Sequence, residues 1–254
     1  MTKHLDVCRR VILVARILAI PVAARAAEPT GGIFEATVGE AGEATPELST
    51  TELQAILQEK SALVFDARPA REFALGHIPG ALNVRGKPGL PASQYTSDVR
   101  DVERVVGEGR SKRIVIYCNG PYCGRSKRLA ADLLAAGFTN VQRYELGMPV
   151  FRALGGVAQI EPEGLRYMLE RDRTTVVFDA GGGNVPGARA LTADEVKAAK
   201  DDGRLPMEDH HARIIVVGGD TAQARAVAIA IAHEAFDNVS FLAGKGRAVV
   251  RDGR

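Results

Sequence analysis

The sequence predicts an α/β fold that is built twice along the chain, each half a mainly parallel sheet flanked by helices. Three observations predict it. Short apolar runs of the kind found in strands buried on both faces alternate with stretches of helical periodicity, an order typical of α/β proteins. The pattern then recurs about a hundred residues later. A chain of 254 residues is long enough for two modest domains.

The first half begins with a helix expected over residues 50–58. Ser49 and Glu52 have the spacing of a capping box, in which each side chain satisfies a free backbone N–H. The later elements are a strand at 62–66, a short helix at 68–75, a turn at Gly80, a strand at 113–117 and a helix at 124–136 that ends before Gly137. Gly137 stands where a helix C-terminus favours glycine.

The second half repeats this order. The matching segments are 64–67 with 177–180, 77–81 with 184–188, 113–117 with 213–217, and 137–141 with 235–239. The second copy is about six residues shorter between Asp179 and Pro186, so a glycine run at 181–183 replaces the short helix. We therefore expect domains at 46–157 and 158–254, after a connecting segment at 27–45.

The first 26 residues have the pattern of an export signal. A basic start that ends in Arg9 and Arg10 precedes an apolar stretch at 11–23 and a small-residue exit at Ala24 to Ala26. The apolar stretch contains Arg16 and is shorter than the roughly 20 residues that span a bilayer. We expect cleavage, a periplasmic or secreted mature protein and no membrane attachment afterwards. The paired arginines leave the choice between the general secretory and twin-arginine routes open.

Composition argues against a nucleic-acid partner. Five of the 33 basic residues and one of the 31 acidic residues lie in the first 26 positions, so the remainder carries a net charge of −2. It contains no basic run with interleaved aromatic residues, the usual footprint of a nucleic-acid binder. Neither a metal nor a cofactor is expected. His210 and His211 lack further ligands at metal-binding spacing, and His77 is expected to hydrogen-bond the backbone.

Cys118 is the strongest candidate for chemistry. It follows the predicted strand at 113–117, and the loop from Asn119 to Gly124 leads into the predicted helix. Ligands of open α/β sheets bind at such strand-to-helix turns. The free N–H groups and positive dipole end of the helix, together with Arg125, would stabilise a thiolate and attract an anion. A buried structural thiol is the alternative.

Several strings resemble the rhodanese-like sulfurtransferases. They are residues 63–68, 71–73, 76–84, 114–118, 124–126 and 144–148, which together cover most of positions 50–155. The resemblance implies a thiolate that takes sulfur from thiosulfate or a polysulfide-like donor, a persulfide intermediate, and transfer to a thiol or cyanide acceptor. A small sulfur-containing anion and a thiol acceptor would then be the partners.

The resemblance also assigns roles within the site. Cys118 would be the nucleophile, and Arg125 would belong to the anion cradle formed by Asn119, Gly120, Pro121, Tyr122 and Gly124. Asp66, at the end of the neighbouring strand, would help order the site. The second half carries a weaker copy in which Gly218 replaces the cysteine, so we expect it to be catalytically inactive.

Two departures from the family pattern keep alternatives open. Six residues separate Cys118 from Arg125, more than in the usual family loop, so a phosphate or arsenate oxyanion remains conceivable. Cys123 lies within this loop, where it is either a small apolar filler or a second thiol able to attack the persulfide or close a disulfide. An oxidised pair would require a reductant, which could be a protein. A thiol–disulfide enzyme and a non-catalytic partner-binding module are the remaining readings.

Overall fold

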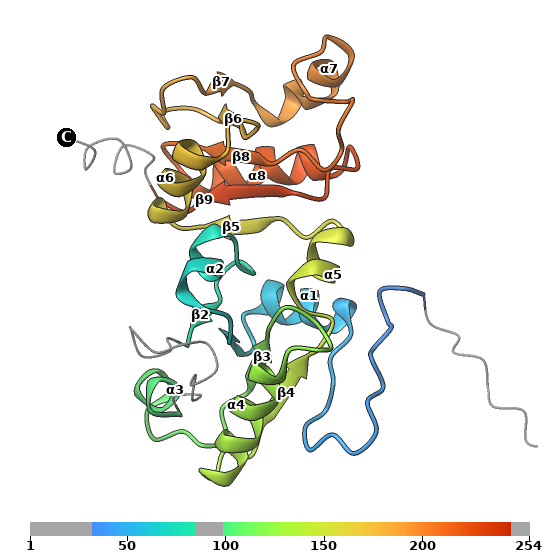
Figure 1. Ribbon diagram of the computed structural model, residues 1–254, viewed down its shortest axis with the longest axis vertical. Coiled ribbons are helices and arrows are strands. Elements are labelled where there is room, and N and C mark those ends of the chain that lie inside the picture. Colours follow the sequence, from blue (N-terminus) through green and yellow to red (C-terminus); the bar gives the residue numbers. More distant parts are fainter. Residues whose placement is uncertain (1–31, 85–98, 245–254) are drawn as a thin grey trace, which may run out of the picture. The chain divides into compact units, whose positions relative to one another are not determined.

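The computed structural model describes residues 32–84 and 99–244, so the expected export signal lies outside the described residues. The described part contains two sheets in which every strand pair is parallel. Helices flank both sheets (Figure 1). The expected α/β class with mainly parallel sheets is confirmed.

The first sheet has the strand order β2-β1-β3-β4. Its elements are α1 (Thr50–Glu59), β1 (Leu63–Asp66), α2 (Ala70–Leu75), β2 (Leu82–Asn83), α3 (Val99–Val106), β3 (Ile114–Tyr117), α4 (Gly124–Ala135), β4 (Val141–Tyr144) and α5 (Gly147–Ala153). The capping box of Ser49 and Glu52 begins α1 as expected. The short helix α2 begins two residues later than predicted, because the residue before a proline is disfavoured in the helical region and Pro69 itself, with ψ 148°, takes the N-cap position.

Alternate side chains of β3 pack into two different cores. Val115 and Tyr117 lie in a cluster with side chains of α1 and α5. Ile114 and Ile116 lie in a second cluster with side chains of α3 and α4. Because successive side chains of a strand point to opposite faces, β3 is covered on both sides, and its carboxyl end opens into the loop that holds Cys118.

The second sheet has the order β5-β9-β8-β6-β7. Its elements are β5 (Ala158–Ile160), α6 (Pro162–Arg171), β6 (Val176–Asp179), β7 (Arg189–Ala190), η2 (Ala193–Glu195), α7 (Val196–Asp201), β8 (Ile214–Val217), α8 (Thr221–Ala232) and β9 (Val239–Leu242). No helix lies between β6 and β7 in this described stretch, in agreement with the glycine run expected to replace it.

The strand order and register of the two sheets correspond as the sequence repeat predicts. Asp66 at the end of β1 pairs with Tyr117 of β3, and Asp179 at the end of β6 pairs with Val217 of β8. β5 lies beside β9 at the edge of the second sheet. At the corresponding edge of the first sheet, Glu47 forms a parallel bridge with Arg143 of β4.

Within residues 32–84 and 99–244, no helix has the length and apolar character that crossing a bilayer requires.

Candidate active site

Cys118 lies at the carboxyl end of β3, a strand with neighbours on both sides. β1 and β4 run parallel to β3, so the carboxyl ends of all three strands lie at one edge of the sheet. The Cys118 side chain is 1% exposed. Its backbone carbonyl accepts a hydrogen bond of 3.0 Å from the amide of Met148, in the first turn of α5. The predicted nucleophile is therefore held from two elements.

The loop after Cys118 is compact and partly exposed. Gly120 is buried and has φ +112°, a value that favours glycine. Its carbonyl accepts a hydrogen bond of 3.0 Å from the Cys123 amide. Asn119 and Pro121 are exposed, and Tyr122 at the tip is fully exposed. These predicted cradle residues lie together in the turn that leads into α4.

A disulfide joins Cys118 to Cys123, which answers a question that the sequence leaves open. The Cα atoms of the pair are 6.1 Å apart, within the usual range for a disulfide. Cys123 is also the N-cap residue of α4 and is half-buried. The structure thus shows the loop in its oxidised state, and a nucleophilic Cys118 requires reduction of this bond.

The N-terminus of α4 has the character of an anion site. Its N-cap makes no side-chain hydrogen bond to the helix, and its first turn contains no acidic residue. Arg125 lies in this first turn, where it is half-buried. Free N–H groups, the helix dipole and a guanidinium group together favour negative charge here.

The corresponding turn of the second sheet has the opposite character. Asp220 is the N-cap of α8, and its carboxylate accepts hydrogen bonds from the amides of Ala222 and Gln223 at 2.5 and 3.4 Å. Gly218 occupies the position of Cys118. This helix N-terminus already holds a negative charge from its own chain and has no thiol beside it.

A buried polar network lies at the end of β3, next to Cys118. The Tyr117 hydroxyl donates to the Asp66 carboxylate at 2.7 Å and accepts from the Ile78 amide at 3.0 Å. Arg68 forms an ion pair with Asp66 at 2.6 Å and donates to the Gly76 carbonyl at 2.7 Å. Both carboxylate oxygens of Asp66 are therefore engaged. Asp66 acts on the site through Tyr117, and we assign it no contact with substrate.

Electrostatics keep this network in one protonation state. Burial and the negative charge of Asp66 raise the pKa of the Tyr117 hydroxyl, so it stays a hydrogen-bond donor. Burial lowers the pKa of Arg68, but the hydrogen bond and charge of Asp66 outweigh it and raise the pKa above its ordinary value. The sequence contained Arg68 and Tyr117 in the resembling strings but did not assign either a role.

Gly147 is a third residue whose role could not be read from the sequence. It has φ +66°, and a Cβ there would overlap the Gly120 amide nitrogen and lie 2.6 Å from the Cys118 carbonyl oxygen. The loop can approach α5 this closely only because the residue is glycine. Its sequence signal was its place in the string at 144–148, which resembles the family pattern.

His77 makes the backbone hydrogen bond that the sequence predicts. His77 Nδ1 lies 2.9 Å from the Phe73 carbonyl oxygen, and its ring stacks on Phe73. His211 is exposed and pairs with Asp237 at 2.7 Å. His210 stacks on Phe236.

Within the described ranges, one group of carboxylates is close enough to share a cation: Glu40, Glu43 and Glu145. Lys127 already lies among them, 2.5 Å from Glu43 and 2.7 Å from Glu40, and Arg143 pairs with Glu43 and Glu145. The hydrogen bond from Lys127 lowers the pKa of Glu43, whereas burial raises that of Glu145. Lys127 and Arg143 therefore offset two of the three negative charges.

The fold and the cysteine loop define an α/β domain with a cysteine between a buried strand and a helix N-terminus. Residues 49–154 match the family profile described as "Rhodanese-like domain". This segment of the chain therefore belongs to the rhodanese-like family.

Curated relatives match over the same region. The chain is 23% identical over 132 residues to a tRNA uridine(34) hydroxylase of Buchnera aphidicola, covering 52% of this chain and 36% of that protein. It is 31% identical over 105 residues to the tRNA uridine(34) hydroxylase of Staphylococcus carnosus, covering 41% of this chain and 30% of that protein. The chain thus spans about a third of the length of these relatives.

Solved structures match more distantly. The 3-mercaptopyruvate sulfotransferase SseA of Escherichia coli aligns with a TM-score of 0.36 at 18% identity, covering 79% of this chain and 98% of that chain. The thiosulfate sulfurtransferase of Pseudomonas aeruginosa aligns with a TM-score of 0.33 at 22% identity, covering 80% of this chain and 44% of that chain.

Proposed function

We propose that this protein is a sulfurtransferase that carries sulfane sulfur as a persulfide on Cys118. The observation that carries the proposal is the position of Cys118 between the carboxyl end of β3 and the N-terminus of α4, whose N-cap offers no competing side-chain acceptor. A thiolate and a persulfide anion both gain from such a helix end. The rhodanese-like profile over residues 49–154 supports the same chemistry.

The reaction has two transfers. The Cys118 thiolate attacks the outer sulfur of thiosulfate; a bond forms between the two sulfurs, the S–S bond of thiosulfate breaks, and sulfite leaves with the electron pair. An acceptor thiolate or cyanide then attacks the outer sulfur of the persulfide and restores the Cys118 thiolate. The disulfide to Cys123 must first be opened by a dithiol, which supplies two electrons and two protons.

The chain's own residues have separate roles in this scheme. The backbone of the loop from Asn119 to Gly124 and the first turn of α4 would bind the incoming anion, with Arg125 adding positive charge. The 2.7 Å hydrogen bond between Tyr117 and Asp66 would hold the carboxyl end of β3 in place beside the loop. The second sheet, with Gly218 and Asp220 at the corresponding turn, would take no part in the chemistry.

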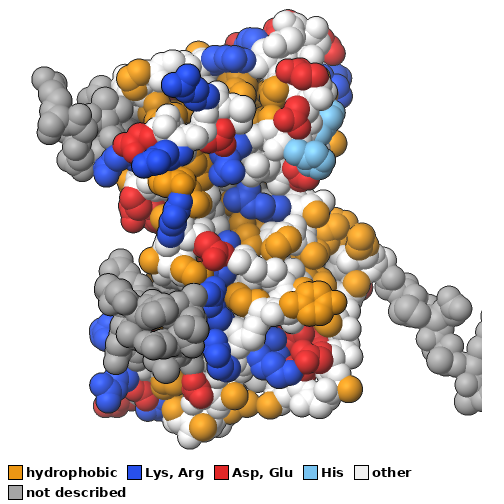
Figure 2. Space-filling model, viewed as in Figure 1, with side chains coloured by type: hydrophobic (Ala, Val, Ile, Leu, Met, Phe, Trp, Pro, Cys, Tyr) orange, Lys and Arg blue, Asp and Glu red, His pale blue; other side chains and the backbone are white. Residues whose placement is uncertain are grey.

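The setting of the activity is part of the proposal. The sequence pattern of residues 1–26 supports action outside the cytoplasm, where thiols tend to oxidise. We propose a small sulfur-containing anion and a thiol as partners. On the face drawn in Figure 2, acidic and basic side chains are interspersed. Together with the net charge of −2 beyond residue 26, this mixture argues against a nucleic-acid partner.

The test is the intact mass of the reduced protein after thiosulfate, and separately after polysulfide. The wild type should gain about 32 Da per sulfur, and cyanide should remove the added mass. Cys118→Ser should gain nothing. Cys123→Ala should still gain sulfur, because the proposal makes Cys118 the carrier and alanine adds no capping acceptor to α4. If neither donor adds sulfur to any protein, sulfur transfer is wrong, and oxyanion or partner binding should be assayed instead.

A further inference from the structure

The two thiols of the loop can reach each other without displacing the helix behind them. The disulfide of Cys118 and Cys123 forms while Cys123 keeps its place as the N-cap of α4. The intervening turn is closed by the hydrogen bond between the Cys123 amide and the Gly120 carbonyl, with Gly120 at φ +112°. The same arrangement puts Cys123 within attacking distance of any sulfur bound to Cys118.

We propose that Cys123 resolves the persulfide on Cys118, so that the protein reduces sulfane sulfur to sulfide. This inference rests on the proposed function, since it needs the persulfide to form. The Cys123 thiolate attacks Cys118 Sγ, a disulfide forms between the two cysteines, and the bond to the outer sulfur breaks. The outer sulfur leaves with the electron pair and takes up the proton that the Cys123 thiol loses on ionising, so it departs as hydrosulfide. The two cysteines are oxidised by two electrons, and the sulfane sulfur is reduced by two.

The bond seen in the structure is the product of this step. Attack by Cys123 on the outer sulfur would only move the persulfide from one cysteine to the other, with no net oxidation. Attack on Cys118 Sγ yields the disulfide that the structure contains. A protein with this loop would therefore end a single turnover in the state described here.

The unequal exposure of the two sulfurs indicates how the loop is reset. Cys118 is 1% exposed, whereas Cys123 is half-buried and follows the fully exposed Tyr122. A protein dithiol arriving from solvent would attack the more accessible Cys123 Sγ. Cys118 would then leave as a thiolate at the N-terminus of α4, where negative charge is favoured. The reductant required for repeated turnover is thus a dithiol protein, and the first turnover needs none.

The experiment is a single turnover without added reductant. Full-length protein in a Cys8→Ser background has Cys118 and Cys123 as its only thiols. It is reduced, freed of reductant under anaerobic conditions and mixed with one equivalent of thiosulfate, after which sulfite, sulfide and intact mass are measured. We expect one sulfite and one sulfide per protein, and a final mass about 2 Da below that of the reduced form, as loss of two hydrogens on disulfide formation requires.

The matched variants separate the resolving role of Cys123 from the proposed sulfur transfer by Cys118. Cys123→Ala, which adds no capping acceptor to α4, should release sulfite, retain about 32 Da as a persulfide and release no sulfide. Its sulfite release shows that Cys118 still attacks thiosulfate. Cys118→Ser should release neither product. A stable persulfide in the parent protein with Cys123 still open to alkylation would overturn the resolving role alone. No sulfite from any of the three proteins would instead overturn the proposed function.

Discussion

Tyr117 and Gly147 fix the position of Cys118 from two sides. Tyr117 precedes it in β3 and is tied by its hydroxyl to Asp66 of β1 and to the Ile78 amide. Gly147 lets the backbone of α5 lie against the Cys118 carbonyl and the Gly120 amide. At the scale of single residues, the position of Cys118 therefore depends on two neighbouring residues, one in its own strand and one in α5.

We predict that Tyr117→Phe destabilises the protein by about 1–3 kcal/mol. The change removes a buried hydroxyl and leaves the Ile78 amide without its acceptor and Asp66 without one of its donors. Urea unfolding followed by circular dichroism measures the loss. The control is Tyr122→Phe, whose side chain is fully exposed and whose stability should stay within about 0.5 kcal/mol. Equal stability of the two variants would show that the network contributes little.

We predict a larger effect for Gly147→Ala. The added methyl carbon would lie 2.6 Å from the Cys118 carbonyl oxygen at φ +66°, so the loop must move. The matched control is Gly155→Ala, which has φ +82° but no atom within 4 Å of the added carbon. The control should lose about 1–2 kcal/mol from its backbone conformation alone, and Gly147→Ala should lose at least about 2 kcal/mol more. Sulfite release from thiosulfate should fall only in Gly147→Ala.

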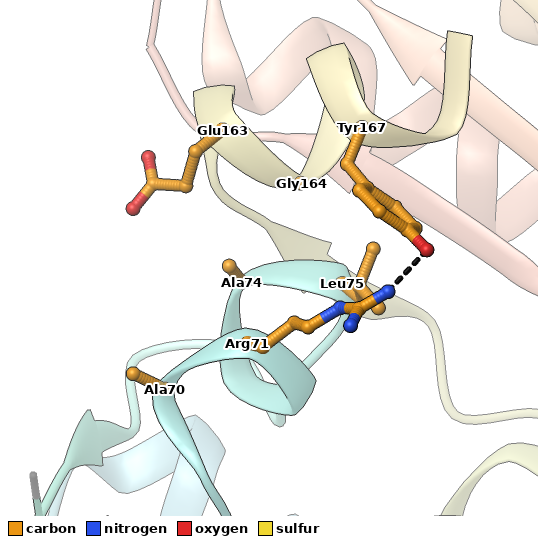
Figure 3. A pocket seen from close by; sticks show the side chains of 7 residues that line it. All are labelled: Ala70, Arg71, Ala74, Leu75, Glu163, Gly164 and Tyr167. Carbon is orange, nitrogen blue, oxygen red and sulfur yellow. Dashed lines mark hydrogen bonds between the residues drawn. The ribbon is translucent and has the colours of Figure 1, made fainter. Parts of the chain in front are cut away.

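At the scale of elements, the packing of α6 on α2 depends on one glycine. A Cβ at Gly164 would overlap the Ala74 carbonyl and lie 2.6 Å from its carbon atom. That carbonyl also accepts a hydrogen bond of 3.0 Å from the Glu161 amide. Beside this contact lies a pocket of about 300 Å³ in which Arg71 of α2 donates to the Tyr167 hydroxyl of α6 (Figure 3). The guanidinium carbon lies 4.4 Å from the centre of the Tyr167 ring.

We predict that Gly164→Ala weakens this helix pair and lowers the free energy of unfolding by about 1–3 kcal/mol, a typical cost of overpacking. Gly124→Ala is the control, because its added carbon meets no atom within 4 Å. Alanine is also the better helix former, so the control should be neutral or slightly stabilised. Urea unfolding of the two variants tests this, and a Gly164→Ala protein as stable as the control would contradict the close contact.

The elements were largely predictable because their signals are local. The apolar runs at 62–66 and 113–117, the capping box at Ser49 and the glycine at 137 each depend on near neighbours along the chain, and all of them appear in the structure. The network of Asp66, Arg68 and Tyr117 could not be read in the same way. Asp66 and Tyr117 are 51 residues apart, and only the strand register brings them together.

The same difference between local signals and long-range contacts explains which features of the candidate site were predictable. A cysteine between a buried strand and a helix was predictable from the order of residues around Cys118. The spacing to Cys123 allows a disulfide but does not determine the backbone turn that forms it, so the pairing stayed open until the loop was seen. The contact of Gly147 with this loop likewise depends on how β4 and α5 are placed beside β3.

At the scale of the whole molecule, His77 lies where the first half of the chain meets β5. Its backbone exchanges two hydrogen bonds of 2.9 Å with Gln159. The ring is fully buried, stacks on Phe73 and has Nε2 3.6 Å from the Glu161 carboxylate. Burial lowers the pKa of His77 to about 4, with Arg68 adding to the effect and the Phe73 carbonyl and Asp66 opposing it.

This pKa predicts a specific loss of stability in mild acid. The unfolded chain binds a proton at His77 near pH 6.5, whereas the folded protein resists protonation until about pH 4. Because the unfolded state binds more protons across this interval, the free energy of unfolding falls as pH decreases from 6.5 to 4. A difference of this size corresponds to roughly 3 kcal/mol from one histidine.

The measurement is urea unfolding at a series of pH values for the wild type and His77→Gln. The variant should start less stable at pH 7 and lose less between pH 6.5 and 4. Parallel curves for the wild type and His77→Gln would mean that the buried ring is not responsible for the acid sensitivity.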